Sequence, residues 1–178
     1  LAVGLLSAVT ERVGGINGLT AEPGANYSVL RANQDYDGGL ASIGAMVTNV
    51  HRALDPSSEA FLHSSAMSGG LDARRRLGRF ELSGALMASR VTGTAEAITR
   101  TQSRPAHYYQ RPDDAIALDS AATSLSGTAV ELRVAKVGGE RSRFEFGYAR
   151  RSAGFEINDI GFLNRANEQA WNSWYALR

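Results

Sequence analysis

The stretch that decides the fold runs from Thr128 to Arg151 and reads TAVELRVAKVGGERSRFEFGYARR. Apolar and charged residues alternate along both halves of it, which is the pattern of a β-strand with two different faces. The apolar positions are Val130, Leu132, Val134, Phe144, Phe146 and Tyr148, and the charged positions between them are Glu131, Arg133, Arg143 and Glu145. The stretch therefore predicts two strands and a turn. Its apolar face has to contact either a protein core or lipid.

The length of the turn follows from the two faces. A two-residue turn at Gly138-Gly139 would place Val134 opposite Arg143, whereas a sheet keeps apolar residues together on one face. A three-residue turn, Gly138-Gly139-Glu140, instead pairs Val134 with Phe144, Leu132 with Phe146 and Val130 with Tyr148, and sets Arg133 opposite Glu145. We therefore expect the three-residue turn, in which a glycine supplies the left-handed residue.

Similar alternation recurs along the chain. In FELSGALMASRV, which begins at Phe80, one face carries Leu82, Leu86 and Ala88. We expect an all-β fold of about eight strands near residues 1–10, 26–35, 40–50, 68–77, 79–91, 125–137, 142–151 and 169–178. No helix is expected, because no stretch shows a convincing helical period with caps.

The connections between the expected strands alternate between long and short. The long ones lie near residues 11–25, 51–67, 92–124 and 152–168, and the short ones lie near 36–39, at Gly78 and near 138–141. An up-and-down meander with long loops at one edge is typical of an outer-membrane β-barrel. Strands of about ten residues also suit a tilted membrane crossing. A soluble β-sandwich remains the alternative, since its loops need not alternate in length.

The bulk composition excludes several classes of protein. The net charge of +1 gives no general case for nucleic-acid binding, and the absence of cysteine excludes disulfides and Cys-based metal sites. No apolar run approaches the roughly 20 residues of a spanning helix, so a membrane role would use strands. The chain starts without a methionine, in an apolar strand-like run, and stops in another. We therefore expect residues 1–178 to be a single barrel segment that is truncated at both ends.

The run GFEINDIGFLNRAN near the C-terminal end carries a family resemblance. Its residues Asn158, Asp159, Gly161, Phe162 and Arg165 resemble the N-D-x-G-F-x-x-R stretch of a bacterial family of unknown function. Nearly the whole chain is similar to that family. The resemblance implies a protein with an N-terminal family-nine-type carbohydrate-binding module and a C-terminal outer-membrane β-barrel, of which this chain is similar to the barrel part. It brings no catalytic residues.

Residues of this motif and of the longest loop have expected local roles. Asn158 and Asp159 are expected to cap a turn through backbone amides. Arg165 could pair with Asp159 and fold the loop inward. In the longest loop, Tyr108, Tyr109, Arg111, Asp113 and Asp114 form a candidate sugar-binding set, although a loop without a ligand is the simpler interpretation.

Other candidate sites are weaker. His51, His63 and His107 show no metal-ligand spacing, and DYDGG from Asp35 is expected to be a tight turn rather than a calcium loop. Glu131 and Glu145 resemble a glycosidase pair only in type, because the expected register places Glu145 beside Arg133. Arg74, Arg75 and Arg76 alternate between faces and therefore present no single basic surface.

These observations predict a non-enzymatic outer-membrane β-barrel of a Gram-negative bacterium, acting as a pore or as a membrane anchor linked to carbohydrate binding or uptake. The apolar face of Val130 and Phe146 would then contact outer-membrane lipid. Glycans are candidate partners, nucleic acid is not, and no cofactor is expected. A soluble carbohydrate-binding β-sandwich and part of a glycoside hydrolase remain the alternatives. Enzyme activity stays open, with hydrolysis suggested only through the family's binding module.

Overall fold

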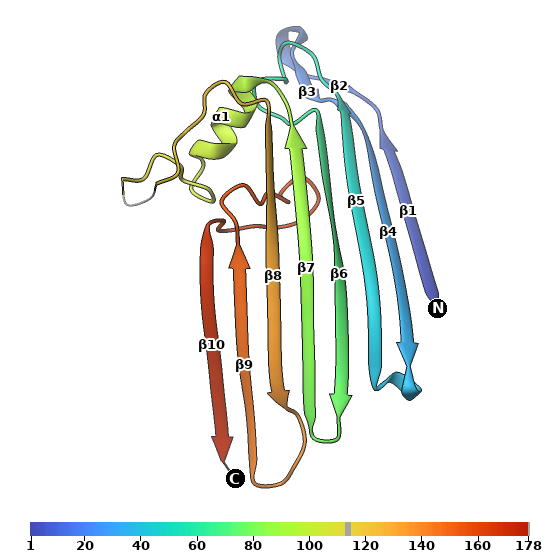
Figure 1. Cartoon of the computed structure of the whole chain (residues 1–178). Helices are drawn as coiled ribbons and strands as arrows, with labels where there is room; N and C mark the ends of the chain where they lie inside the picture. The colour runs from blue at the N-terminus through green and yellow to red at the C-terminus, as the bar shows by residue number, and fades with distance from the viewer. Residues whose placement is uncertain (113–114, 178) are drawn as a thin grey trace.

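Eight long antiparallel strands form one sheet in the computed structural model, which describes residues 1–112 and 115–177. The strands pair in chain order, so the sheet is a simple meander (Figure 1). They are β1 (Ala2–Thr10), β4 (Gly24–Tyr36), β5 (Ala41–Ala53), β6 (Ser65–Leu77), β7 (Phe80–Thr92), β8 (Ser124–Lys136), β9 (Ser142–Arg151) and β10 (Glu168–Leu177). This confirms the all-β meander and places each expected strand within a few residues.

The smaller elements lie in the connections. They are β2 (Val13–Gly14), η1 (Ile16–Gly18), β3 (Thr20–Glu22), η2 (Asp37–Gly39) and α1 (Ala95–Ser103). The sheet is open, because β1 and β10 each pair on one side only. Barrel closure therefore remains a prediction. The described residues do not form the two packed sheets that a sandwich requires. Their one other sheet is the two-stranded β2–β3 hairpin.

The connections alternate in length as expected. All long connections lie at one end of the sheet, together with α1 and the β2–β3 hairpin, and the tight turns lie at the other end (Figure 1). We call these the loop end and the turn end. At the turn end Gly78 has a φ of 59° and Gly38 a φ of 64°. Glycine tolerates these left-handed conformations without steric cost, so both reversals can be short.

The register between β8 and β9 corrects the expected turn. Val134 lies opposite Phe146 and Leu132 lies opposite Tyr148, two residues away from the expected pairing. The connection is correspondingly longer, at residues 137–141. Its first amides, of Val137 and Gly138, donate to the Arg79 carbonyl and so hold the connection against the neighbouring turn. A shift of two residues leaves each side chain on its face, so the face assignment is unaffected.

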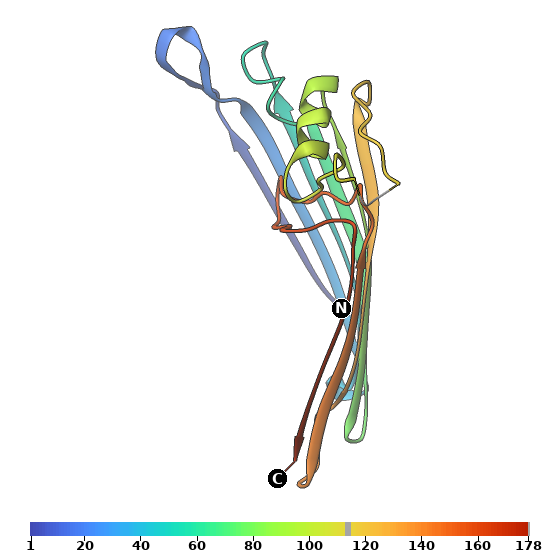
Figure 2. The same ribbon diagram turned by 90° about the vertical axis from the view of Figure 1, so that its left-hand side faces the viewer.

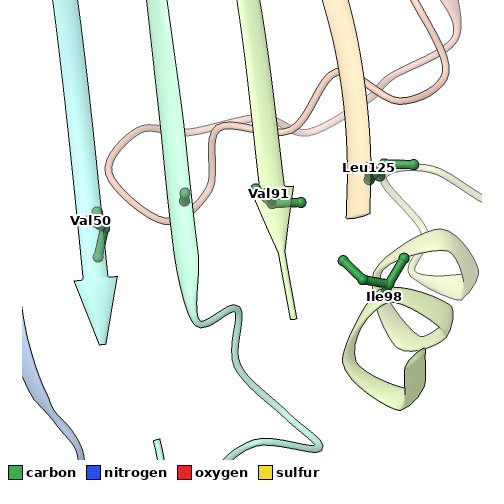
Figure 3. Packing of buried hydrophobic residues seen from close by; sticks show 5 residues of the cluster. Val50, Val91, Ile98 and Leu125 are labelled. Atoms are coloured by element: carbon green, nitrogen blue, oxygen red, sulfur yellow. The ribbon is translucent and has the colours of Figure 1, made fainter. Parts of the chain in front are cut away.

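The helix α1 was not predicted from the sequence, from which no helix was expected. Thr94 is its N-cap, and its hydroxyl accepts a hydrogen bond of 3.2 Å from the Ala97 amide. Ile98 is fully buried and packs against the strands, in a cluster with Val50, Val91 and Leu125 (Figure 3). At nine residues the helix is too short to be stable alone. Packing against the sheet therefore stabilises it, and no sequence period reveals that contact.

The two faces of the sheet have different surroundings. The sheet is curved, and α1 and the loop formed by residues 152–167 lie on its concave side (Figure 2). We call this the inner face and the opposite side the outer face. The buried apolar residues form two clusters, both on the inner face near the loop end. They comprise Val50, Ala66, Val91, Ile98 and Leu125 in one, and Ala129, Phe155, Leu163 and Ala166 in the other.

We expect Thr94→Ala to lower the stability of α1 by about 1 kcal/mol, because it removes the N-cap hydrogen bond. Thr94 also donates a hydrogen bond of 2.9 Å to the Glu59 carbonyl, so the loop before β6 loses a contact as well. Hydrogen exchange of the α1 amides measures the change. Thr94→Ser keeps the hydroxyl and should leave the exchange rates near those of the parent; equal rates in both variants would contradict the cap.

Candidate functional site

The loop of residues 152–167 runs across the inner face after β9 (Figure 2). Near its start the Ser152 amide donates to the Thr128 carbonyl of β8, at 2.9 Å. Farther along, Ile160 packs against the cluster that contains Val50 of β5. Near its end the Ala166 amide donates to the Ala106 carbonyl, at 2.7 Å. The loop thus spans the inner face from β9 to β5, and we call it the crossing loop.

Two glycines allow the crossing loop to touch β8 backbone to backbone. A Cβ atom at Gly127 would lie 2.1 Å from the Phe155 nitrogen, and one at Gly154 would lie 2.2 Å from the Ser126 oxygen. Neither atom can be accommodated without moving the loop or the strand. The buried Phe155 side chain then packs against Ala129.

Asp159 of the crossing loop binds two cationic or titratable partners on the loop-end side of β5 and β6. Its Oδ1 accepts a hydrogen bond of 2.5 Å from Arg52, at the end of β5. Its Oδ2 lies 2.7 Å from His63 Nδ1, just before β6. All three side chains are about nine-tenths buried. Arg165 does not take part as expected, because its guanidinium lies 3.9 Å from Glu168.

The order Asp159–His63–Thr101 resembles the carboxylate–imidazole–hydroxyl series of a hydrolase. His63 Nε2 lies 2.8 Å from the Thr101 hydroxyl. That hydroxyl donates in turn to the Ala97 carbonyl inside α1, at 3.1 Å, and Thr101 is only 1% exposed. A substrate cannot reach it in this arrangement. The series ties the crossing loop to α1 rather than presenting a nucleophile.

A second buried pair anchors the first part of the crossing loop. His107 Nε2 lies 2.8 Å from Glu156 Oε2, and both side chains are essentially inaccessible to solvent. His107 Nδ1 lies 2.7 Å from the Ala153 carbonyl oxygen, which can only accept. The Glu156 amide donates to the Ser89 hydroxyl of β7, at 2.9 Å. Charged groups at this depth require such partners, because an unpaired buried charge is strongly destabilising.

The pKa values of both loop carboxyls are lowered. Burial alone would raise the pKa of Asp159, but the hydrogen bond and charge of His63, together with Arg52, outweigh it. Burial likewise opposes ionisation of Glu156, and the contacts with His107 and the Asn158 amide outweigh it. Both groups are therefore held as carboxylates in the folded protein.

The remaining motif residues have structural positions. The Asn158 side-chain oxygen accepts a hydrogen bond of 2.7 Å from the Leu163 amide, which confirms that Asn158 caps a turn. The carboxylate of Asp159 does not cap, because Arg52 and His63 occupy it. Gly161 lies against Ile157, and Phe162 is 83% exposed.

The expected ligand loop is divided by the structure. Tyr109 is half-buried against the core and its ring meets His107 edge-on, with the centroids 6.2 Å apart. Burial raises its pKa. Tyr108 is exposed beside it, with a φ of 49°. Arg111 is engaged in a contact within the chain. Asp113 and Asp114 lie outside the described residues, so ligand binding by this loop stays a prediction.

A strip of ion pairs crosses the inner face nearer the turn end. Arg31 binds Asp72 through both nitrogens, at 2.5 and 2.7 Å. Arg133 contacts Glu81 at 2.9 Å and Glu145 at 2.6 Å. The strip lines a polar hollow of about 650 Å³. Arg133 and Glu145 thus form the predicted inner-face ion pair, although as diagonal rather than direct neighbours.

Glu131 belongs to the same surface. Its carboxylate lies 3.1 Å from Arg151, which also contacts Glu168 at 3.1 Å. Of the three consecutive arginines, Arg75 is on the outer side and binds Asp37, while Arg74 contacts Glu81 at 3.5 Å. The carboxylates of the strip therefore all have guanidinium partners.

Between the strip and the crossing loop lies a more apolar cleft of about 330 Å³, lined in part by Met46, Met87, Ile157 and Ile160. Within residues 1–112 and 115–177, no group of three or more His, Asp or Glu side chains could hold a metal ion. In the same part of the chain, none of the helices has the length and apolar character to cross a membrane.

Comparison with known proteins identifies the family but not its activity. A family model described as Domain of unknown function (DUF5916) matches residues 1–178. The chain belongs to this family. No curated protein and no solved structure matches it. The expected membership of a family of unknown function is confirmed at this level, whereas the carbohydrate-binding module and the barrel stay predictions.

The anchors of the crossing loop in this DUF5916 chain were missed by sequence reasoning. In the sequence His63 and His107 show no metal-ligand spacing, and nothing singles out Arg52 or Glu156. His63 and Asp159 are separated by 96 residues, so no local spacing connects them. The available signal was the motif around Asp159 itself, because a carboxylate in an apolar loop needs a cationic partner somewhere.

Anchoring of the crossing loop should be lost in acid. Because the pKa of Asp159 is lower in the folded than in the unfolded chain, its stabilising contribution is complete above about pH 4. It then falls as the pH drops through the folded value. The chain has no cysteine, so Phe162→Cys gives one site for a spin label. We expect the label's mobility to rise below about pH 4.

A second variant and a control complete this test. Adding Asp159→Asn should make the label mobile already at pH 7, because Arg52 and His63 then lose their ionised partner. A label at Leu77→Cys, exposed at the turn end, should keep its mobility throughout. Equal acid responses at both labels would indicate global unfolding instead.

Proposed function

We propose that this chain is part of an outer-membrane β-barrel of a Gram-negative bacterium, whose outer face contacts lipid and whose inner face lines a polar passage narrowed by the crossing loop. The single observation that carries the proposal is the shape of the apolar band on the outer face. A surface that contacts lipid is expected to be apolar. In addition, the borders of its apolar band run parallel to the membrane plane and therefore cross tilted strands obliquely.

The outer face is apolar over all eight strands, and no described element covers it. α1 and the crossing loop lie on the other side (Figure 2). Exposed patches of this extent are rare on soluble monomers. The apolar residues include Leu5, Leu30, Ile43, Val47, Met67, Leu71, Leu82, Leu86, Leu132, Val134, Phe146, Trp171 and Tyr175, all at least 40% exposed.

The border of the band at the turn end runs obliquely. Gln34 marks it in β4, and the row of paired residues through Gln34 reaches β8 at Leu132. In β8, however, the border residue is Lys136, four residues nearer the turn end. Arg75 of β6 lies between them, in the row of Val134. The border therefore moves by one residue per strand.

The border at the loop end slopes in the same direction, but only beyond β7. Asn49 marks it in β5, and its row passes Arg90 and reaches β8 at Ser126. In β9 the border residue is Arg150, whose row meets β8 at Val130. This border therefore follows one row from β5 to β7 and lies four residues nearer the turn end in β9, with Met67 as an apolar exception in its first row.

The border at the turn end thus inclines the apolar band to the strands. Four residues correspond to about 13 Å along a strand, and four strands to about 19 Å across the sheet, giving an inclination of about 35°. Strands of transmembrane barrels tilt by roughly 35–45°. A core-facing surface has no reason to show such borders, whereas a tilted strand in a bilayer requires them.

The inner face suits an aqueous passage. Its charged residues pair with one another across the strands, as in the strip of Arg31, Asp72, Arg133 and Glu145. Gly44 leaves room for the Arg31–Asp72 pair, and Gly147 leaves room for the Asn172 side chain. Carbohydrate binding or uptake remains part of the proposal, as the resemblance implies. No observation favours a hydrolase, and the open outer face disfavours the soluble sandwich.

Charged substitutions on the outer face should show depth dependence. Leu71 in mid-strand and Leu77 at the turn end lie on the same strand and the same face, and are 60% and 62% exposed. In a bilayer, Leu71→Arg should cost about 2–4 kcal/mol and Leu77→Arg about 0–1 kcal/mol. On a water-exposed surface the two would be equivalent. Unfolding free energies in liposomes compare them, and equal values would contradict lipid contact.

The two tryptophans of the chain provide a direct test of orientation. Trp171 lies on the outer face and Trp174 on the inner face, three residues apart in β10. In protein reconstituted with brominated phospholipid, Trp171 alone should be quenched by the lipid, and Trp174 alone by aqueous acrylamide. Single-tryptophan variants, Trp174→Phe and Trp171→Phe, separate the two signals. The reverse pattern, or acrylamide quenching of both, would overturn the proposal.

A further inference from the structure

The polar hollow on the inner face has the size of a small-molecule site. Its volume of about 650 Å³ lies within the roughly 300–1,000 Å³ that is common for ligand pockets. Such pockets are usually lined mainly by apolar groups, whereas this one combines apolar surface with guanidinium, carboxylate, amide and hydroxyl groups. A ligand that fills it has to carry both polar and apolar surface.

The charges of the hollow cancel locally. Arg31 binds Asp72 and Arg133 binds Glu145, with nitrogen–oxygen distances of 2.5 and 2.6 Å. The arginine side chains are nevertheless 40% exposed, so some of their five N–H donors remain accessible. An ionic ligand would have to compete with these close pairs. A neutral hydroxyl can donate to a carboxylate and accept from a guanidinium while the pairs stay intact.

The surface continues into β10, where Asn172 lines the hollow and Trp174 lies beside it, opposite Glu145. Trp174 lies on the inner face, 48% exposed, and hydrogen-bonds Glu145. Asn172 lies over Gly147, where an added Cβ would come within 2.3 Å of the Asn172 oxygen. The exposed indole offers a flat apolar face, and the amide offers a donor and an acceptor side by side. An aromatic face beside planar, two-point hydrogen-bonding groups fits a ring that carries C–H groups on its faces and hydroxyls at its edge.

We propose that this hollow binds a neutral polyhydroxylated solute, a saccharide, with Trp174 stacking on the ring and Asn172, Arg133 and Asp72 hydrogen-bonding its hydroxyls. The inference rests on the proposed function, because the inner face has to be open to water. It assigns the binding to the sheet itself, and not to the loop that contains Tyr108.

The test uses the full chain in detergent micelles with Trp171→Phe, which leaves Trp174 as its one tryptophan. Titration with maltotriose should change the Trp174 fluorescence saturably. Polyethylene glycol of the same mass, which has ether oxygens but few hydroxyls, should give no saturable change, and neither should sodium phosphate. Adding Asn172→Ala should weaken maltotriose binding about threefold to tenfold, the loss expected for one or two hydrogen bonds.

Gly147→Ala supplies a second variant, because its methyl group displaces the Asn172 side chain; it should weaken binding similarly. Acrylamide quenching of Trp174 is recorded in every sample. If Trp174 is quenched but maltotriose gives no saturable change, or binds Asn172→Ala and Gly147→Ala as tightly as the parent, the saccharide site is overturned and the membrane proposal stands. If acrylamide does not reach Trp174 in the micelles, the orientation fails, and both proposals fall with it.

Discussion

The strict alternation of side chains along each strand is the constraint on which the rest of the structure depends. Paired residues in neighbouring strands point to the same side, so one odd-numbered slip in register would exchange the two faces of every following strand. The rows through Leu71, Leu86 and Val130 keep their apolar residues on one side across β6, β7 and β8. The strip of ion pairs around Arg31 and Arg133 and the buried clusters occupy the other side. Both proposals depend on this separation.

The contacts of the crossing loop show a different kind of interaction from those of the sheet. Its anchors are buried ion pairs, which contribute little net stability because desolvation offsets their attraction. These ion pairs do, however, constrain the positions of the paired side chains closely. Asp159 has to meet Arg52 and His63, and Glu156 has to meet His107, or a charge is left buried without a partner. Apolar contacts of the same size would tolerate several positions of the loop, whereas these pairs specify one.

The sequence predicted the sheet well because its pattern is local. Strand positions, face assignments and the alternation of loop lengths all follow from periods of two and from the turn residues around Gly38 and Gly78. The β8–β9 register was wrong by two residues because a contact with the neighbouring turn at Arg79 decides the loop length. α1 was missed because packing of Ile98 stabilises it. The partners of Asp159 were missed because they lie far away in the sequence, and the nearby Arg165 was a plausible but incorrect substitute.

The path of the crossing loop also has a consequence for the shape of the sheet. The loop leaves β9 and is fixed to Arg52 at the end of β5, so it passes β8, β7 and β6 on the concave side. It is therefore a chord of the arc that these five strands describe. The radius of an arc is determined by the length of its chord and by the length along the arc. Here the number and the spacing of the strands give the length along the arc. In this fold the curvature, and with it the diameter of any cylinder that the sheet helps to form, depends on the part of the loop that reaches from β9 to Asp159, residues 152–159, as well as on the number of strands.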